Sequence, residues 1–162
     1  MALTITTTAG SASANAYCTL EQAEAYVATL VWSSDWTGKT DEQKKAAIIN
    51  AARLLDTLQF KGSRADEAQA MAWPRINVVD RDGYEVDSAT VPAAVVNANA
   101  EFALRLFAED RAADAGAIVP ERVKLGQMEV EKQRRQMIPA SVRDLLSGLL
   151  ATTGGVITGV RG

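Results

Sequence analysis

The sequence contains no histidine and only one cysteine, Cys18. Without histidine the chain lacks the side chain most often used for proton transfer near neutral pH, and it also lacks Ser-His and Cys-His nucleophile pairs. One cysteine excludes an intrachain disulfide and a cysteine-based zinc site within one chain, and such a thiol is more often a small buried hydrophobe than a nucleophile. Carboxylate pairs and Ser-Lys pairs stay open. We therefore expect a protein that is not an enzyme and uses no metal or other cofactor.

Recognisable ligand-binding and catalytic motifs are also missing. There is no Walker A loop, no GxGxxG, no GxSxG and no HExxH. The acidic stretch 80–87 superficially resembles a calcium loop, but its glycine comes too early and it lacks the terminal Glu, so a turn is favoured. No run approaches the roughly 20 apolar residues of a membrane span, and residues 1–15 lack the features of a signal peptide. These absences predict no membrane partner and a protein of a reducing cytoplasm, or of a particle built there.

The chain is mildly acidic, with a net charge of −3. Nucleic-acid binding requires clustered Lys and Arg that displace counterions from phosphates, so this charge disfavours it while leaving a local basic patch open. The candidate DNA-proximal residues are the basic run Lys132, Arg134 and Arg135, for which a solvated or subunit-facing patch is the commoner interpretation. Three tryptophans are able to stack bases, namely Trp32, Trp36 and Trp73. Packing in a core or interface is the commoner fate for them.

Helix signals dominate the chain. Residues 1–16 are rich in Thr, Ser, Ala and Gly and predict an N-terminal arm that is weakly ordered alone. Capping boxes at 19–22 and 40–43 begin two amphipathic helices, the second ending near Phe60. The helix predicted at 92–113 has a narrow polar stripe, so its surplus apolar surface is expected to contact a neighbouring subunit.

Short hairpins and a tail complete the predicted fold. Turn residues predict one hairpin at about 76–88 and a second at about 121–132, although a bulged strand also fits the second. A last short helix begins near Ser141, and residues 151–162 form an extended tail that either frays or pairs with another chain's sheet edge. The expected fold class is mainly α, a small antiparallel helical bundle over 17–150 with one or two hairpins and extended terminal segments. The residues assigned to a subunit interface are Val95, Phe102, Leu106, Phe107, Leu145 and Leu149.

An ordered set of short motifs resembles a family of tailed-phage neck proteins. These motifs are Asn15-Ala-Tyr17, the stretch 20–26 (LEQAEAY), 51–56 (AARLLD), 60–62 (FKG), 72–75 (AWPR), 80–83 (DRDG), 91–94 (VPAA), Leu145-Leu146 and 160–162 (VRG). Ala16 and Val27 stand where the family usually has Ser and an aromatic residue. The family is similar to head-to-tail connector adaptors and is also labelled as DnaT-like single-stranded DNA-binding proteins.

The resemblance implies a structural role in a bacteriophage. A homo-oligomer, a ring of twelve subunits under the portal, would extend the DNA channel and connect capsid to tail. Its partners would be the portal protein, a downstream neck or tail protein, and genomic DNA that passes without sequence-specific binding. Assembly would occur in the host cytoplasm, and the protein would reside in the virion neck. Portal binding is assigned to the tail residues Gly154, Gly155, Val156, Ile157, Thr158, Gly159, Val160, Arg161 and Gly162. The alternative is a single-stranded DNA-binding accessory protein.

Overall fold

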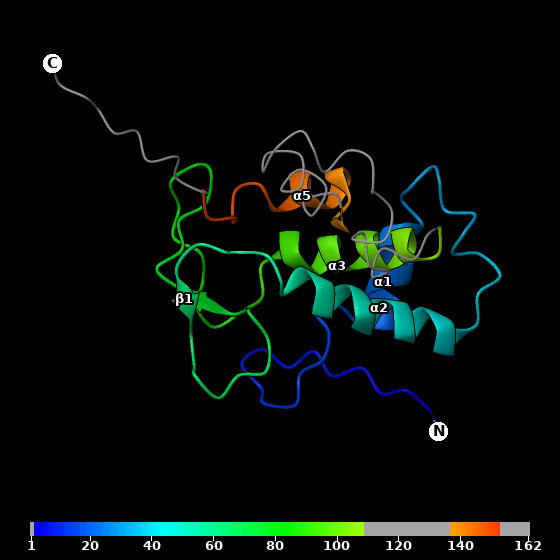
Figure 1. Ribbon diagram of the computed structural model, residues 1–162, viewed down its shortest axis with the longest axis horizontal. Helices are drawn as coiled ribbons and strands as arrows, with labels where there is room; N and C mark the ends of the chain where they lie inside the picture. Colours follow the sequence, from blue (N-terminus) through cyan, green and yellow to red (C-terminus); the bar gives the residue numbers. More distant parts are fainter. Residues whose placement is uncertain (1, 109–136, 153–162) are drawn as a thin grey trace, which may run out of the picture.

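A computed structural model of the chain describes residues 2–108 and 137–152. Its elements in chain order are α1 (Leu20–Val27), α2 (Asp41–Leu55), β1 (Ser63–Arg64), β2 (Arg75–Ile76), α3 (Ala93–Leu106) and α5 (Ala140–Leu146). The two strands form one small antiparallel sheet. The predicted fold class, mainly helical with a little β-structure, is confirmed (Figure 1). No helix in these two described ranges is long and apolar enough to cross a membrane.

Both predicted capping boxes are present. The Thr19 hydroxyl accepts a hydrogen bond from the Gln22 amide at 3.2 Å, and the Gln22 side chain accepts one from the Thr19 amide at 2.8 Å. Thr40 and Gln43 repeat this pattern at the start of α2. Each box satisfies two backbone donors that a helix N-terminus would otherwise leave free. The sequence therefore locates both helix starts correctly.

The long apolar helix α3 lies at the centre of the bundle. It packs against α1, α2 and α5, which together surround it (Figure 1). Val95 and Phe102 are fully buried in the core that these helices form. The narrow polar stripe of α3 is thus explained within one chain, because three neighbouring helices cover most of its surface.

The segment after α2 departs from the sequence prediction. Helix α2 ends at Leu55 rather than near Phe60, because the Thr57 and Leu58 amides turn back onto the carbonyls of Leu54 and Leu55. Phe60 then forms a bridge with Leu150, so a strand-like segment replaces the last helical turn. The loop returns through β1 and β2, whose pairing was not predicted.

Gly62 makes the close approach before β1 possible. Its φ of +65° lies in the left-handed region, and a Cβ there would lie 2.1 Å from the backbone oxygen of Ile76. Only glycine fits this conformation and this space.

The hairpin predicted at about 76–88 is present in a shorter form. Val79 and Glu85 form an isolated antiparallel bridge around the turn, and the Asp80 amide donates to the Tyr84 carbonyl at 2.9 Å. The Asp80 carboxylate accepts hydrogen bonds from the amides of Asp82 and Tyr84, so this acidic turn is closed by its own backbone. The second predicted hairpin, at about 121–132, lies outside the described residues.

The N-terminal arm is tied to the helical domain by hydrogen bonds. The Asn15 carboxamide accepts from the Thr6 amide and donates to the Thr4 carbonyl. The Leu3 amide donates to Glu42 on α2 at 2.8 Å. Cys18, directly after the arm, is fully buried, which confirms the expected core thiol, and burial raises its pKa to about 12.

Candidate nucleic-acid interface

The three tryptophans have different environments. Trp36 and Trp73 are 3% and 1% exposed, which confirms the prediction that they pack inside the protein. Trp32 is 83% exposed, and its neighbour Val31 is 87% exposed, so Trp32 does not pack in the core of this chain. Helix α1 ends at Val27, and the chain then turns through residues 28–30 instead of extending the helix over the core. Tryptophan side chains are normally mostly buried, so a tryptophan that is mostly exposed indicates a surface that contacts a ligand or partner.

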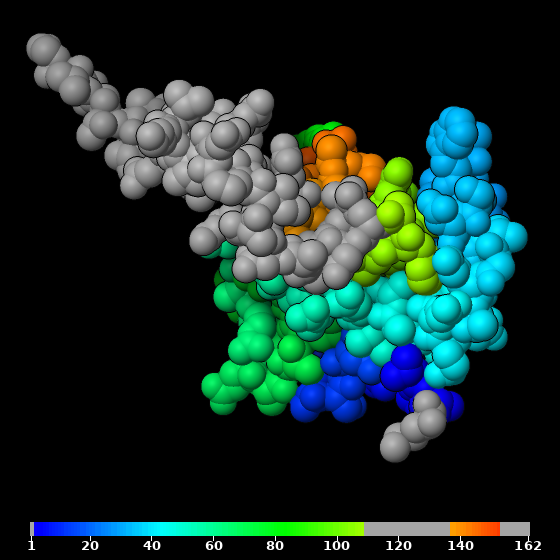
Figure 2. Space-filling model, turned by 45° about the vertical axis from the view of Figure 1, so that its right-hand side comes forward, coloured from blue at the N-terminus to red at the C-terminus, as the bar shows by residue number. Residues whose placement is uncertain are grey.

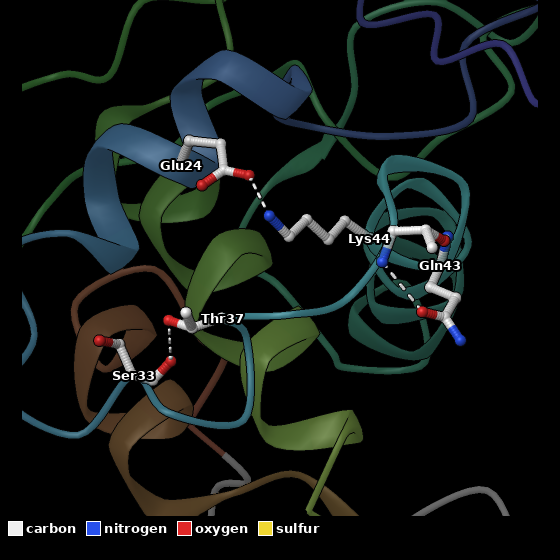
Figure 3. A network of polar contacts seen from close by, with 6 residues as sticks. Glu24, Ser33, Thr37, Gln43 and Lys44 are labelled. Atoms are coloured by element: carbon white, nitrogen blue, oxygen red, sulfur yellow. Dashed lines mark hydrogen bonds and ion pairs between the residues drawn. The ribbon is translucent and has the colours of Figure 1, made fainter.

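Trp32 lies in an ordered loop between α1 and α2, residues 28–39, which we call the tryptophan loop. The carbonyl of Ser33 accepts hydrogen bonds from the Trp36 amide at 3.1 Å, from the Thr37 amide at 3.3 Å and from the Thr37 hydroxyl at 3.3 Å. Figure 3 shows Ser33 and Thr37 facing each other across this turn. The Lys39 amide closes the loop by donating to the Trp36 carbonyl. Trp32 therefore projects from a loop with defined geometry.

Trp36 anchors this loop to the core. Its ring meets the Phe107 ring edge to face, with centroids 5.7 Å apart. The Lys44 ammonium lies 5.4 Å from the centre of the Trp36 ring, and the Lys39 ammonium lies 5.2 Å from the centre of the Phe107 ring. These cation–π contacts fix two lysines at the base of the tryptophan loop.

The lysines near the loop differ in how their charges are balanced. Lys44 forms an ion pair with Glu24 at 2.6 Å, which connects α2 to α1 (Figure 3). Burial by itself raises the pKa of Glu24, but its polar contacts, led by the Lys44 hydrogen bond, outweigh burial and lower that pKa below its usual value. Lys45 pairs with Glu42 at 3.1 Å. Among the described residues Lys39 has no carboxylate partner, so its charge is available to an anion.

This arrangement offers one aromatic platform and one available cation on a fixed loop. Single-stranded nucleic acids are held by these two kinds of contact, base stacking on exposed aromatic side chains and attraction of phosphates to basic side chains. The loop also carries Asp35, and Asp41 follows at the start of α2. The electrostatic part of such a contact is therefore modest, and stacking on Trp32 would supply most of the affinity.

A comparison with protein families shows which family the chain belongs to. The family model described as "Putative DnaT-like ssDNA binding protein" matches residues 1–162. The chain belongs to this family. No curated protein and no solved structure matches it.

Membership in the DnaT-like family overturns the head-to-tail adaptor interpretation. The matching model is that of the DnaT-like family and not of a phage adaptor family, so the expected portal-bound ring of twelve subunits is wrong. The expected partners of that ring, the portal protein and a neck or tail protein, are therefore wrong as well. The expected virion location depended on the same interpretation and loses its support. The short motifs indicate membership in a family, but they do not decide between the two functions that the family's labels name.

The residues assigned earlier to subunit and portal contacts lie in several environments. Of the expected subunit-interface residues, Val95, Phe102 and Leu149 are buried in this chain's own core, Leu106 and Phe107 pack partly against it, and Leu145 is 36% exposed. The tail residues 154–162 and the basic run at Lys132, Arg134 and Arg135 lie outside the described residues. The first residue of the predicted tail pairs with its own domain, since the Ala151 amide donates to the Gln59 carbonyl at 2.9 Å.

Two other polar clusters are closed by packing and do not form an open site. The Tyr17 hydroxyl donates to Asp56, whose carboxylate also accepts from the Ala72 amide at 3.2 Å. Burial raises the pKa of Asp56 despite these contacts. On α3 the buried Glu101 accepts hydrogen bonds from Arg105 and from the Tyr26 hydroxyl. Both clusters connect elements of the fold, which is a structural role.

Proposed function

We propose that this protein binds single-stranded DNA and that Trp32 is a stacking platform for one base. The observation that carries the proposal is the 83% exposure of Trp32 on a loop held by the Ser33 turn and by buried Trp36. Membership in the DnaT-like family supports the same ligand class. The absence of histidine supports a binding role rather than a catalytic one.

Intrinsic fluorescence provides a direct test. Trp36 and Trp73 are buried, so Trp32 is the tryptophan that a stacked base is able to quench. We expect oligo(dT) to quench part of the emission of the wild-type protein and none of the emission of the Trp32→Ala variant. The variant should lose about 1–3 kcal/mol of binding free energy, which corresponds to about 5- to 150-fold in affinity.

Folding controls make this test specific. Because Trp32 is mostly in solvent, Trp32→Ala should change the free energy of unfolding by no more than about 0.5 kcal/mol. Trp32→Phe keeps an aromatic face and should retain most of the affinity, measured by anisotropy of a labelled oligonucleotide. Equal affinities of the wild-type and Trp32→Ala proteins would show that Trp32 is not the platform.

A further inference from the structure

Positive charge is concentrated in one part of this acidic chain. Between Glu42 and Asp66 there are five basic residues, Lys44, Lys45, Arg53, Lys61 and Arg64, and one acidic residue, Asp56, which gives a net charge of 5 − 1 = +4. The four acids Asp41, Glu42, Asp66 and Glu67 flank this stretch in pairs at its two ends. The whole chain has a net charge of −3. This segment begins on α2 immediately after the tryptophan loop and ends in β1. Its first residues therefore lie next to the proposed stacking platform, and its last residues lie at the sheet.

Helix α2 connects the tryptophan loop to the β1–β2 sheet. Its 15 residues span about 22 Å, and in Figure 1 the helix runs from the loop at one side of the molecule to β1 at the other. Its buried residues face the core, whereas Arg53 is exposed on the other side and Lys45 lies at the margin. In Figure 2 part of α2 is at the surface, between the light-blue loop and the green segment after residue 60.

The cations of this surface have few acidic partners. Arg53 donates to the neutral side chain of Asn50, and Lys61 donates to the carbonyls of Val79 and Gly148. Arg64 donates to the Gln69 carbonyl at 3.0 Å. Within the described ranges none of these side chains forms an ion pair with a carboxylate. Lys45 does pair with Glu42, but an ion pair at the surface contributes at most about 1 kcal/mol.

The two-stranded sheet adds a like-charge pair. Arg64 of β1 lies directly opposite Arg75 of β2 in the strand register. Like charges opposite each other destabilise a sheet. Asp56 offsets part of this charge. The Arg75 guanidinium donates to the backbone carbonyls of Lys61, Ala72 and Gly62, which fix its position without supplying a negative charge. An anion bound across the two strands would relieve the remaining repulsion.

We infer that Lys45, Arg53, Lys61, Arg64 and Arg75, which we call the basic belt, bind the phosphodiester backbone of a single strand whose base stacks on Trp32. The inference rests on the proposed function and extends it, because it gives the strand a direction across the surface, from the tryptophan loop along α2 to the sheet. Lys45 and Arg53 are eight residues apart on the helix, which is about 12 Å. The belt therefore contacts several successive phosphates of a bound strand, and affinity increases with oligonucleotide length.

The test compares short and long oligonucleotides with belt variants. Oligo(dT) of about 4 and about 12 nucleotides, within the range of site sizes for single-strand binding folds, is titrated at several salt concentrations. In the wild-type protein the longer strand should bind more tightly and with a steeper salt dependence. In the Arg53→Gln/Arg64→Gln variant the slope of log affinity against log salt should become shallower by about 0.7 for each lost phosphate contact. Binding of the short strand and quenching of Trp32 should not change.

The matched control keeps the charge. Arg53→Lys/Arg64→Lys should retain the salt slope, whereas a purely structural role of the guanidinium groups would affect both double variants equally. The single variant Arg53→Gln keeps the test valid if the double variant does not fold, because Arg53 is exposed and donates only to Asn50.

The possible outcomes separate this inference from the proposed function. An unchanged slope and affinity for the long strand in the Gln variant, with Trp32 still quenched, would overturn the belt and leave the stacking platform intact. A belt-dependent slope without quenching of Trp32 would support the belt and overturn the platform. If neither the short nor the long oligonucleotide binds, both the belt and the stacking platform are overturned. Displacement of the long strand by polyglutamate at equal charge concentration would indicate an acidic protein partner and would also overturn the belt.

Discussion

Asn99 is a buried polar residue at the centre of the core. Its replacement tests how much its hydrogen bonds to the end of the N-terminal arm and to α2 stabilise the folded protein. The side chain is fully buried on α3. Its oxygen accepts hydrogen bonds from the amides of Tyr17 at 2.9 Å and Cys18 at 3.3 Å, and its nitrogen donates to the Ile48 carbonyl at 2.9 Å. One carboxamide therefore joins the end of the arm, α2 and α3.

The Asn99→Leu variant keeps the approximate size of the side chain and removes all three hydrogen bonds. The amides of Tyr17 and Cys18 would remain buried without an acceptor, at about 1–3 kcal/mol each. The apolar leucine side chain offsets part of this cost, because its burial is favourable by about 1.5–3 kcal/mol. We expect a net loss of about 1–4 kcal/mol in the free energy of unfolding, a large share of the about 5–15 kcal/mol typical of a domain.

Urea denaturation followed by circular dichroism measures this loss, with Asn97→Leu as the control. Asn97 lies on the same helix and is only partly buried, so its replacement should change stability by no more than about 0.5 kcal/mol. Equal midpoints for the two variants would refute the reasoning, since they would mean that the Tyr17 and Cys18 amides find other acceptors at no cost.

Two further predictions concern backbone geometry and pH. Gly62→Ala should destabilise the protein by more than about 1 kcal/mol, because a Cβ there meets the Ile76 oxygen at 2.1 Å; Gly38→Ala, whose φ is also positive but whose surroundings are open, should show a clearly smaller drop in Tm. Burial raises the pKa of Asp56, so the folded state holds this proton more tightly than the unfolded state, and the contribution of Asp56 to stability falls as pH rises from about 4 through the raised pKa. The Asp56→Asn variant should therefore lose less stability than the wild type between pH 4 and pH 7 in urea denaturation, and an equal loss would contradict the assignment.

Local signals in the sequence predicted the helices well and their contacts less well. Thr19 and Thr40 determine where helices begin, because a capping box is satisfied within four residues and needs no knowledge of the rest of the chain. Pairings between distant segments, such as Phe60 with Leu150 or β1 with β2, depend on where the helices place those segments. The same limit explains α3, whose apolar surface is covered by α5 from the other end of the chain.

The exposure of Trp32 was missed for a related reason. A tryptophan just after an amphipathic helix usually folds back onto the core. Here Trp36, four residues later, occupies the position against Phe107, and the Ser33 turn points the chain away. One signal was available in the sequence: the apolar pair Val31-Trp32 stands directly before the polar stretch 33–35, between two helices. Exposed apolar side chains in such a loop often mark an interaction site.

Net charge gave the least reliable argument about the ligand. A value of −3 disfavours phosphate binding only if the charges are evenly spread, because a phosphate responds to cations within about 8–10 Å at physiological salt. Between Glu42 and Asp66 the balance is +4, although two acidic residues flank the stretch at each end. An acidic chain with a basic belt would bind a strand along one path while its other surfaces repel phosphate. Such a protein should bind duplex DNA more weakly than a single strand, since the bases of a duplex are not free to stack on Trp32.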